Sequence, residues 1–255
     1  MPLILSGNVA SATADAGYTV ANSCRFDDGS SDNLSRSPGS ASNRTTWTWS
    51  CWVKRCTLGA YQVIFVGGSP NTWIRFRDDD TLGVFAQEDY KVDVKTDMLF
   101  RDVSSFYHIC VSVDTTQGAE SNRVKIYVNG SLVDVTVTYA EQNYEMGINN
   151  TGTHYVGRLN YVAVQYIDMY LAEMVLIDGS QLAPTSFGEF DEDSPTIWKP
   201  IDVSGLTFGT NGFYLDFEDS AALGDDKSGN SNDFTVNNLD ATDQATDTPT
   251  NNFCT

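Results

Sequence analysis

A run of oxygen-bearing side chains towards the C-terminal end of the sequence could bind a hard cation such as calcium. Six carboxylate, amide or hydroxyl side chains fall within nine residues around Gly229, which permits a tight turn. They are Asp225, Asp226, Ser228, Asn230, Asn232 and Asp233. A similar acidic loop near the other end adds Asp27 and Asp32 as candidate calcium ligands. The alternative is a plain turn, because Asp, Asn, Ser and Gly favour turns and the spacing departs from the EF-hand pattern.

Aromatic side chains in or near predicted turns could bind carbohydrate. Sugar binding would use exposed aromatic rings for stacking, with Asn, Asp and Gln side chains for the hydroxyl groups. The candidate glycan-binding residues are Trp73, Tyr90, Tyr144 and Tyr161. The alternative role for each ring is packing in the core.

The charge of the chain limits its partners. Net charge is −19, from 34 acidic and 15 basic residues. We expect no nucleic acid partner, because phosphate backbones are bound through Lys and Arg. The five cysteines lack the spacing of metal ligands, and we interpret them as mostly buried thiols, with a disulfide left open. The sequence indicates no required cofactor, and calcium is the one optional ion.

The sequence contains no targeting or membrane segment that we recognise. No stretch approaches the roughly 18 consecutive apolar residues that a membrane helix needs. The N-terminus has no basic region and only a short apolar stretch, so it does not resemble a signal peptide. We therefore expect a protein made in a cytoplasm, with no membrane insertion.

The elements that must position these side chains are predicted to be β-strands. Alternation over residues 46–53 puts Trp47 and Trp49 on one face, and residues 106–113 alternate in the same way. The Asn-Gly pair at 129–130 predicts a type I′ hairpin turn. No long segment has helical periodicity. The sequence therefore predicts an all-β, two-sheet antiparallel β-sandwich of the jelly-roll type.

Three segments, in this order, resemble the laminin-G-like, concanavalin A-like family. Their sequences are TWTWSCWVK at 46–54, FYHICVSVD with VKIYVNG at 106–130, and YVGR with YLAEMVLID at 155–178. The resemblance implies a concanavalin A-like jelly roll.

A closer resemblance is to virion proteins of marine bacteriophages that carry this domain. It rests on ADAGYTVANS at 14–23, LSRSP at 34–38, TNGFYLDF at 210–217, DKSGNSNDFTVNNL at 226–239 and TPTNNF at 248–253. The resemblance implies a capsid decoration, spike or tail fibre located in the virion. Its partners would be other virion subunits and a cell-surface glycan, and we expect a homo-oligomer, with a trimer as our choice.

We predict an N-terminal arm over residues 1–16, a β-sandwich over 17–236 and a polar C-terminal arm over 237–255. Residues 214–233 resemble the opening of such a domain, yet they follow its closing strand. We expect residues 212–236 to return beside the first strands and complete the sheets. The alternative is a truncated second copy.

An enzyme of this fold would need catalytic carboxylates. Its glycoside hydrolases carry a Glu-x-Asp-x-x-Glu strand, whereas the nearest match here, Glu189-Phe-Asp191-Glu-Asp-Ser194, ends in Ser and lies in a predicted loop. Two histidines and no Gly-x-Ser-x-Gly elbow leave little for a triad or a zinc site. We predict a non-enzymatic virion structural protein that acts in assembly and host-surface adhesion. The alternatives are a carbohydrate-binding lectin module and, less favoured, a glycoside hydrolase.

Overall fold

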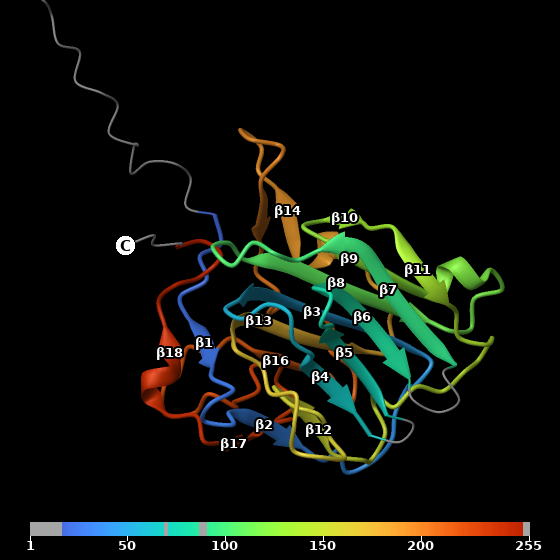
Figure 1. Cartoon of the computed structure of the whole chain (residues 1–255), viewed down its shortest axis with the longest axis horizontal. Helices are drawn as coiled ribbons and strands as arrows, with labels where there is room; N and C mark the ends of the chain where they lie inside the picture. Colours follow the sequence, from blue (N-terminus) through green and yellow to red (C-terminus); the bar gives the residue numbers. More distant parts are fainter. Residues whose placement is uncertain (1–16, 69–70, 87–90, 252–255) are drawn as a thin grey trace, which may run out of the picture.

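The computed structural model describes residues 17–68, 71–86 and 91–251, and it confirms the predicted all-β sandwich (Figure 1). Two antiparallel sheets pack face to face. Sheet A has the order β10 (Ser131–Leu132), β9 (Val124–Val128), β8 (Tyr107–Asp114), β3 (Thr46–Arg55), β13 (Met169–Asp178), β1 (Ser23–Phe26) and β18 (Gln244–Ala245), with β16 (Phe213–Leu215) also paired to β13. Sheet B has the order β11 (Val135–Thr138), β7 (Val92–Leu99), β6 (Thr81–Ala86), β5 (Thr72–Phe76), β4 (Gln62–Gly67), β12 (His154–Val156), β2 (Asn33–Arg36) and β17 (Thr235–Asn237).

The remaining elements are short. Strands β14 (Gly188–Phe190) and β15 (Trp198–Pro200) form a separate hairpin. The 3-10 helices in the described residues are η2 (Glu120–Asn122), η3 (Pro184–Ser186) and η4 (Ala241–Asp243). No helix in this described part is long and apolar enough to cross a membrane.

Alternation along β3 forms the centre of the core. Trp47 and Trp49 point between the sheets and are fully buried. Their partners on β8 are Val113 and Val111, which lie in the same core. The predicted hairpin turn is confirmed, because Asn129 joins β9 to β10 with φ of 46° and Gly130 follows with φ of 78°.

The C-terminal segment pairs with strands from the opposite end of the sequence. β16 pairs with the second half of β13, while β1 pairs with its first half, so β1 and β16 lie end to end along one edge. β17 pairs with β2, and β18 pairs with β1. The predicted C-terminal arm is described as far as residue 251, and this part lies against the sandwich. The predicted N-terminal arm, residues 1–16, lies outside the described residues.

The outer face of sheet A is covered by residues that follow β13. Cys110, Val175 and Ile177 point out of this face and are buried. Phe187, Val203, Phe208 and Tyr214 cover them. A second cluster packs Trp198 of the hairpin on Trp52, and Trp198 Nε1 donates a hydrogen bond to His108 Nδ1 at 3.0 Å. The central strands of sheet A, β3 and β13, are therefore buried on both faces.

Four of the cysteines are free, and three of these are buried, as the sequence predicts. The buried ones are Cys24, Cys51 and Cys110, while Cys56 is exposed. Cys254 lies outside the described residues.

The packing of β16 predicts how a substitution at Phe213 changes the stability of the protein. Phe213 is fully buried and meets Phe65 and Phe234 edge-on, with ring centroids 5.7 and 4.8 Å away. We expect Phe213→Ala to lower the free energy of unfolding by about 3–5 kcal/mol, the usual cost of such a cavity. The matched control, Phe190→Ala, removes a ring from the exposed hairpin and should cost about 1 kcal/mol or less. Urea unfolding followed by tryptophan fluorescence measures both, and equal losses would contradict this placement of β16.

Candidate ligand-binding face

The outer face of sheet B carries a continuous row of side chains from neighbouring strands. Core residues such as Leu34, Ile74 and Val84 point inward, so the residues that alternate with them point outward. Strand register aligns, in order across the sheet, Thr235, Ser35, Tyr155, Val66, Trp73 and Phe85. Three strand spacings separate Ser35 from Trp73, or about 14 Å. The row joins a polar region at one end to an aromatic region at the other.

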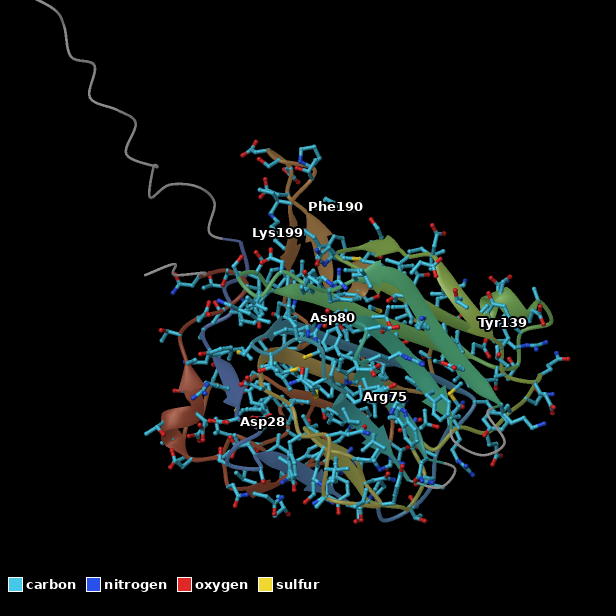
Figure 2. The ribbon with its side chains drawn as sticks, viewed as in Figure 1. Asp28, Arg75, Asp80, Tyr139, Phe190 and Lys199 are labelled. Atoms are coloured by element: carbon cyan, nitrogen blue, oxygen red, sulfur yellow. The ribbon has the colours of Figure 1, made fainter. Side chains whose placement is uncertain are left out.

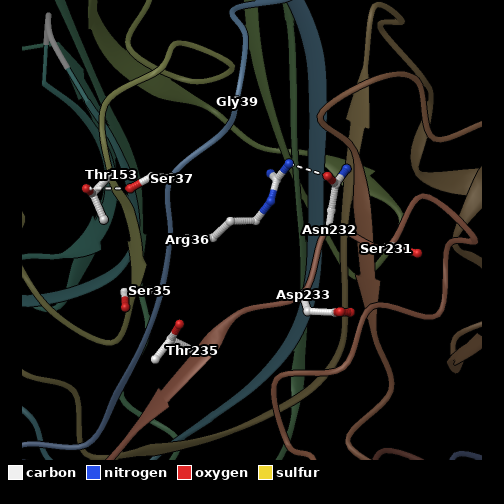
Figure 3. Close-up of a pocket in the computed structure, with 9 residues that line it drawn as sticks. All are labelled: Ser35, Arg36, Ser37, Gly39, Thr153, Ser231, Asn232, Asp233 and Thr235. Carbon is white, nitrogen blue, oxygen red and sulfur yellow. Dashed lines mark hydrogen bonds between the residues drawn. The ribbon is translucent and has the colours of Figure 1, made fainter.

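The polar end of the row is a pocket of about 520 Å³ (Figure 3). Its lining residues are Ser35, Arg36, Ser37, Gly39, Thr153, Ser231, Asn232, Asp233 and Thr235. The Arg36 guanidinium donates to Asn232 Oδ1 and to the carbonyl of Asn211, and burial lowers the pKa of this arginine. Ser37 and Thr153 hydroxyls lie 2.8 Å apart. The pocket thus offers hydroxyl, amide, carboxylate and guanidinium groups to a polar ligand.

The other end of the row is an aromatic–arginine patch, formed by Tyr61, Trp73, Arg75, Phe85, Tyr155, Arg158, Tyr161 and Tyr166. Trp73 stacks on Phe85 with ring centroids 4.9 Å apart. The Arg75 guanidinium lies 4.7 Å from the Tyr61 ring centroid and 5.2 Å from that of Trp73. Figure 2 labels Arg75 on this sheet. Alternation along β5 explains the contact, because Trp73 and Arg75 share the outward face.

The segment between β12 and β13 folds over this patch. Leu159 is buried against Trp73 and Phe85, and Asn160 Nδ2 donates to Asn71 Oδ1 at 2.6 Å. Tyr161 then comes within 6.3 Å of Trp73, measured between ring centroids. Arg158 stacks on Tyr155 at 4.5 Å, so a second guanidinium lies on an aromatic ring. The segment therefore places both an aromatic ring and a cation above sheet B.

The predicted glycan-binding residues separate into different environments. Trp73 is only 3% exposed and supports the patch from below, whereas Tyr161 is 59% exposed and presents its ring to solvent. Tyr144 packs against the main core. Tyr90 lies outside the described residues. The structure thus brings two of the predicted residues together, and adds Tyr61, Arg75 and Arg158, which the sequence analysis missed.

The predicted calcium loop at 225–233 is hydrogen-bonded to β16. The Asp226 carboxylate accepts four hydrogen bonds, from the amides of Tyr214, Ser228 and Asn232 and from the Ser228 hydroxyl. Asp233 accepts the amide of Asp226, and the Asp225 carboxylate pairs with Lys227 at 2.6 Å.

Other members of the predicted calcium set also have partners within the protein. The Asn230 side chain donates to the carbonyls of Gly209 and Gly212. In the second loop, Asp27 accepts the amide of Gly29, and Asp32 accepts the amide of Asp27. No group of three or more His, Cys, Asp or Glu placed to hold a metal occurs within the described ranges. Calcium binding at these loops stays a prediction from sequence.

The nearest match to a hydrolase motif lies away from both sheets. Glu189 belongs to strand β14, so the prediction of a loop at this residue was wrong. Lys199 on β15 lies 3.4 Å from the Glu189 carboxylate and 3.5 Å from that of Asp191. The Ser194 amide and Lys199 lower the pKa of Asp191, which is the opposite of what a general acid requires.

A buried carboxylate that the sequence analysis missed lies between β1 and β16. Glu173 has φ of 50°, at an irregularity in the pairing of β13 with β3. Its Oε2 accepts the hydroxyls of Tyr18 at 3.0 Å and Tyr214 at 2.7 Å. Burial raises the pKa of Glu173 to about 7. This cluster ties the N-terminal end of the described chain to sheet A.

The raised pKa of Glu173 makes protein stability depend on pH. The folded protein keeps this proton up to a pKa of about 7, whereas an ordinary Glu releases it near 4.5. The free energy of unfolding should therefore fall as pH rises through this interval. Between pH 4.5 and 8, the free energy of unfolding of Glu173→Gln should rise by on the order of 3 kcal/mol relative to that of the unsubstituted protein.

Urea unfolding at a series of pH values measures this difference. Glu145→Gln is the matched control, because Glu145 is an exposed carboxylate paired with Arg44. Unfolding curves for Glu173→Gln that run parallel to those of the unsubstituted protein across the interval would contradict the assignment.

Comparison with known proteins identifies a family and solved structures that share this fold. A family model described as the concanavalin A-like lectin/glucanases superfamily matches residues 28–181. A Bacteroides ovatus protein described as carbohydrate-binding aligns with a TM-score of 0.60 and 13% identity, over 86% of this chain and 59% of its own. A heptameric SAP-like pentraxin of Limulus polyphemus gives 0.48 and 14%, over 66% of this chain and 80% of its own.

A further solved structure, mouse laminin alpha1 domains LG4-5, gives a TM-score of 0.45 and 13% identity, over 65% of this chain and 43% of its own. No curated protein sequence matches the chain. At these identities the likeness shows the fold alone.

Proposed function

The chain belongs to the concanavalin A-like lectin/glucanases superfamily, and we propose that it is a non-enzymatic carbohydrate-binding protein whose ligand lies across the outer face of sheet B. The observation that carries the proposal is the row from the polar pocket to the aromatic–arginine patch. Hydroxyl and amide groups at one end suit the hydroxyls of a sugar, and the exposed ring of Tyr161 at the other suits its apolar face.

The rigidity of this face also favours ligand binding. The row lies on hydrogen-bonded strands above a packed core, so its side chains are held in place before a ligand arrives. Sheet A has no comparable face, because its outer side is already covered by the chain itself. The Bacteroides ovatus protein described as carbohydrate-binding has the same fold.

The absence of catalysis is part of the proposal. Glycoside hydrolysis needs two carboxyl groups about 5–9.5 Å apart on either side of the scissile bond. Glu189 and Asp191 lie on the separate hairpin and are paired with Lys199. Glu173 has the raised pKa of an acid, but it is buried beneath two tyrosine hydroxyls on the other sheet. Neither set faces the proposed ligand.

Tyr161 provides the test of this function. Its exposed ring is the one best placed to stack on a sugar, so Tyr161→Ala should weaken binding by about 1–2 kcal/mol, or about five- to thirtyfold in Kd. Tyr139→Ala is the matched control, because Tyr139 lines a different hollow beside β9 and β11. A glycan array followed by calorimetry on its hits measures both variants. The absence of binding to any glycan, or an equal loss in both variants, would contradict the proposal.

We also propose that the protein works as a subunit of a bacteriophage virion, as capsid decoration, spike or tail fibre. The sequence resemblance supports this role, and one structural observation favours it. The β14–β15 hairpin projects from the sandwich (Figures 1 and 2) and exposes Phe190 and Ile197, which are 44% and 56% accessible. Exposed apolar side chains of this kind suit a contact with other subunits.

An assembly role predicts self-association through the hairpin. We expect a homotrimer in light scattering, and we expect Ile197→Asp to dissociate it, because a carboxylate would be buried without a partner. Val164→Asp is the matched control, since Val164 is exposed elsewhere, in the segment over sheet B. A monomeric protein that fails to bind virus particles lacking it would refute the assembly role and leave the carbohydrate proposal standing.

A further inference from the structure

Arg75 differs from every other arginine in the described residues because its side chain donates no hydrogen bond within this part of the protein. Each of the others donates to at least one carboxylate, amide or carbonyl oxygen. Arg75 is half-buried, and its guanidinium lies over the aromatic rings of Tyr61, Trp73 and Phe85, at 4.7, 5.2 and 5.6 Å from their centroids. Its planar fork of N–H donors is therefore unused.

The carboxylates nearest to these N–H donors pair with other cations, although the chain is acidic. The carboxylate of Asp93 is paired with Arg77 at 3.2 Å, and Asp79 is paired with Lys95 at 3.2 Å. Burial, and after it the nearby Arg77, lower the pKa of Arg75. The more distant Asp93 acts in the opposite direction, but no carboxylate of the described residues forms an ion pair with Arg75. A partly desolvated cation of this kind would stabilise a bound anion by more than simple surface attraction.

The second arginine of the patch points to the same ligand chemistry. Arg158 stacks on Tyr155, and its one hydrogen bond in the described structure is from Nε to the carbonyl of Leu159. Its terminal nitrogens thus remain available above the same sheet. Arginine forks match a planar carboxylate with two parallel hydrogen bonds, which a lysine cannot reproduce.

We propose that the aromatic–arginine patch selects a sugar that carries a carboxylate, with the carboxylate on Arg75 and the sugar ring on Tyr161. This inference rests on the proposed carbohydrate-binding function and narrows it to acidic glycans. The chemistry fits two sources, uronic acids and sialic acids, because both present a carboxylate attached directly to a sugar ring. The polar pocket at the far end of the row then binds the neutral part of a longer chain.

Calorimetry with matched pairs of glycans tests the inference. The probes are trigalacturonate against its methyl ester, and 3′-sialyllactose against lactose, with sucrose octasulfate, which carries sulfates and no carboxylate, as a control for charge alone. We expect at least one acidic probe to bind about tenfold to a hundredfold more tightly than its neutral counterpart, as expected for a charge-assisted hydrogen bond. The pair that shows the preference identifies the source of the carboxylate.

Variants at Arg75 connect the preference to the patch. Arg75→Gln should abolish the difference between acid and neutral probes, and Arg75→Lys should retain only a small part of it. Arg25→Gln is the matched control, because Arg25 is exposed on sheet A and paired with Asp27. Thermal melting of each variant establishes that it is folded. If Arg75→Gln does not fold, the affinities of Arg75→Lys for the acid and neutral probes test the inference.

The outcomes separate this inference from the function it rests on. Equal binding of acid and neutral probes, an acid preference that survives Arg75→Gln, or binding of sucrose octasulfate that matches the acidic probes would each overturn the carboxylate inference and keep the carbohydrate function. Failure of every glycan to bind, neutral ones included, would overturn both.

Discussion

The structure depends on one constraint, which is that the two central strands of sheet A are buried on both faces. β3 and β13 bury nearly every residue along their length. One face packs on sheet B, and the other has to be removed from water by another part of the chain. The residues after β13 provide that cover, through Trp198, Val203, Phe208 and Tyr214. The outer face of sheet B is covered differently, by the short segment between β12 and β13, which leaves Tyr161 exposed to a ligand.

Polar side chains, rather than further strands, hold this cover in place. Asp226 binds three backbone amides and so fixes the loop that follows β16. Glu173 occupies the gap between β1 and β16, where it links tyrosines from two distant parts of the chain. His108 receives the Trp198 indole and anchors the hairpin. Buried polar groups of this kind are stable only when fully hydrogen-bonded, which explains their position at the junctions between segments.

The sequence was enough to predict the fold, because alternation in β3 and β8 is local and the Asn129-Gly130 turn has a local signature. The candidate site was only partly predictable. Trp73 and Tyr161 were recognisable as aromatic residues near turns, but Arg75 was missed because its aromatic contacts depend on pairing between strands. The sequence could not distinguish the two roles open to the acidic loops for a related reason. A carboxylate that caps backbone amides, as Asp226 does, has the same sequence pattern as one that binds a cation.

We propose that the ligand binds on the outer face of sheet B. Amide chemical-shift mapping during titration with the tightest-binding oligosaccharide tests this most directly. We expect shifts confined to β4, β5, β12, the segment over them and the residues 231–235 of the polar pocket. Shifts confined to the β14–β15 hairpin or to the edge strands of sheet A, with sheet B unchanged, would contradict it.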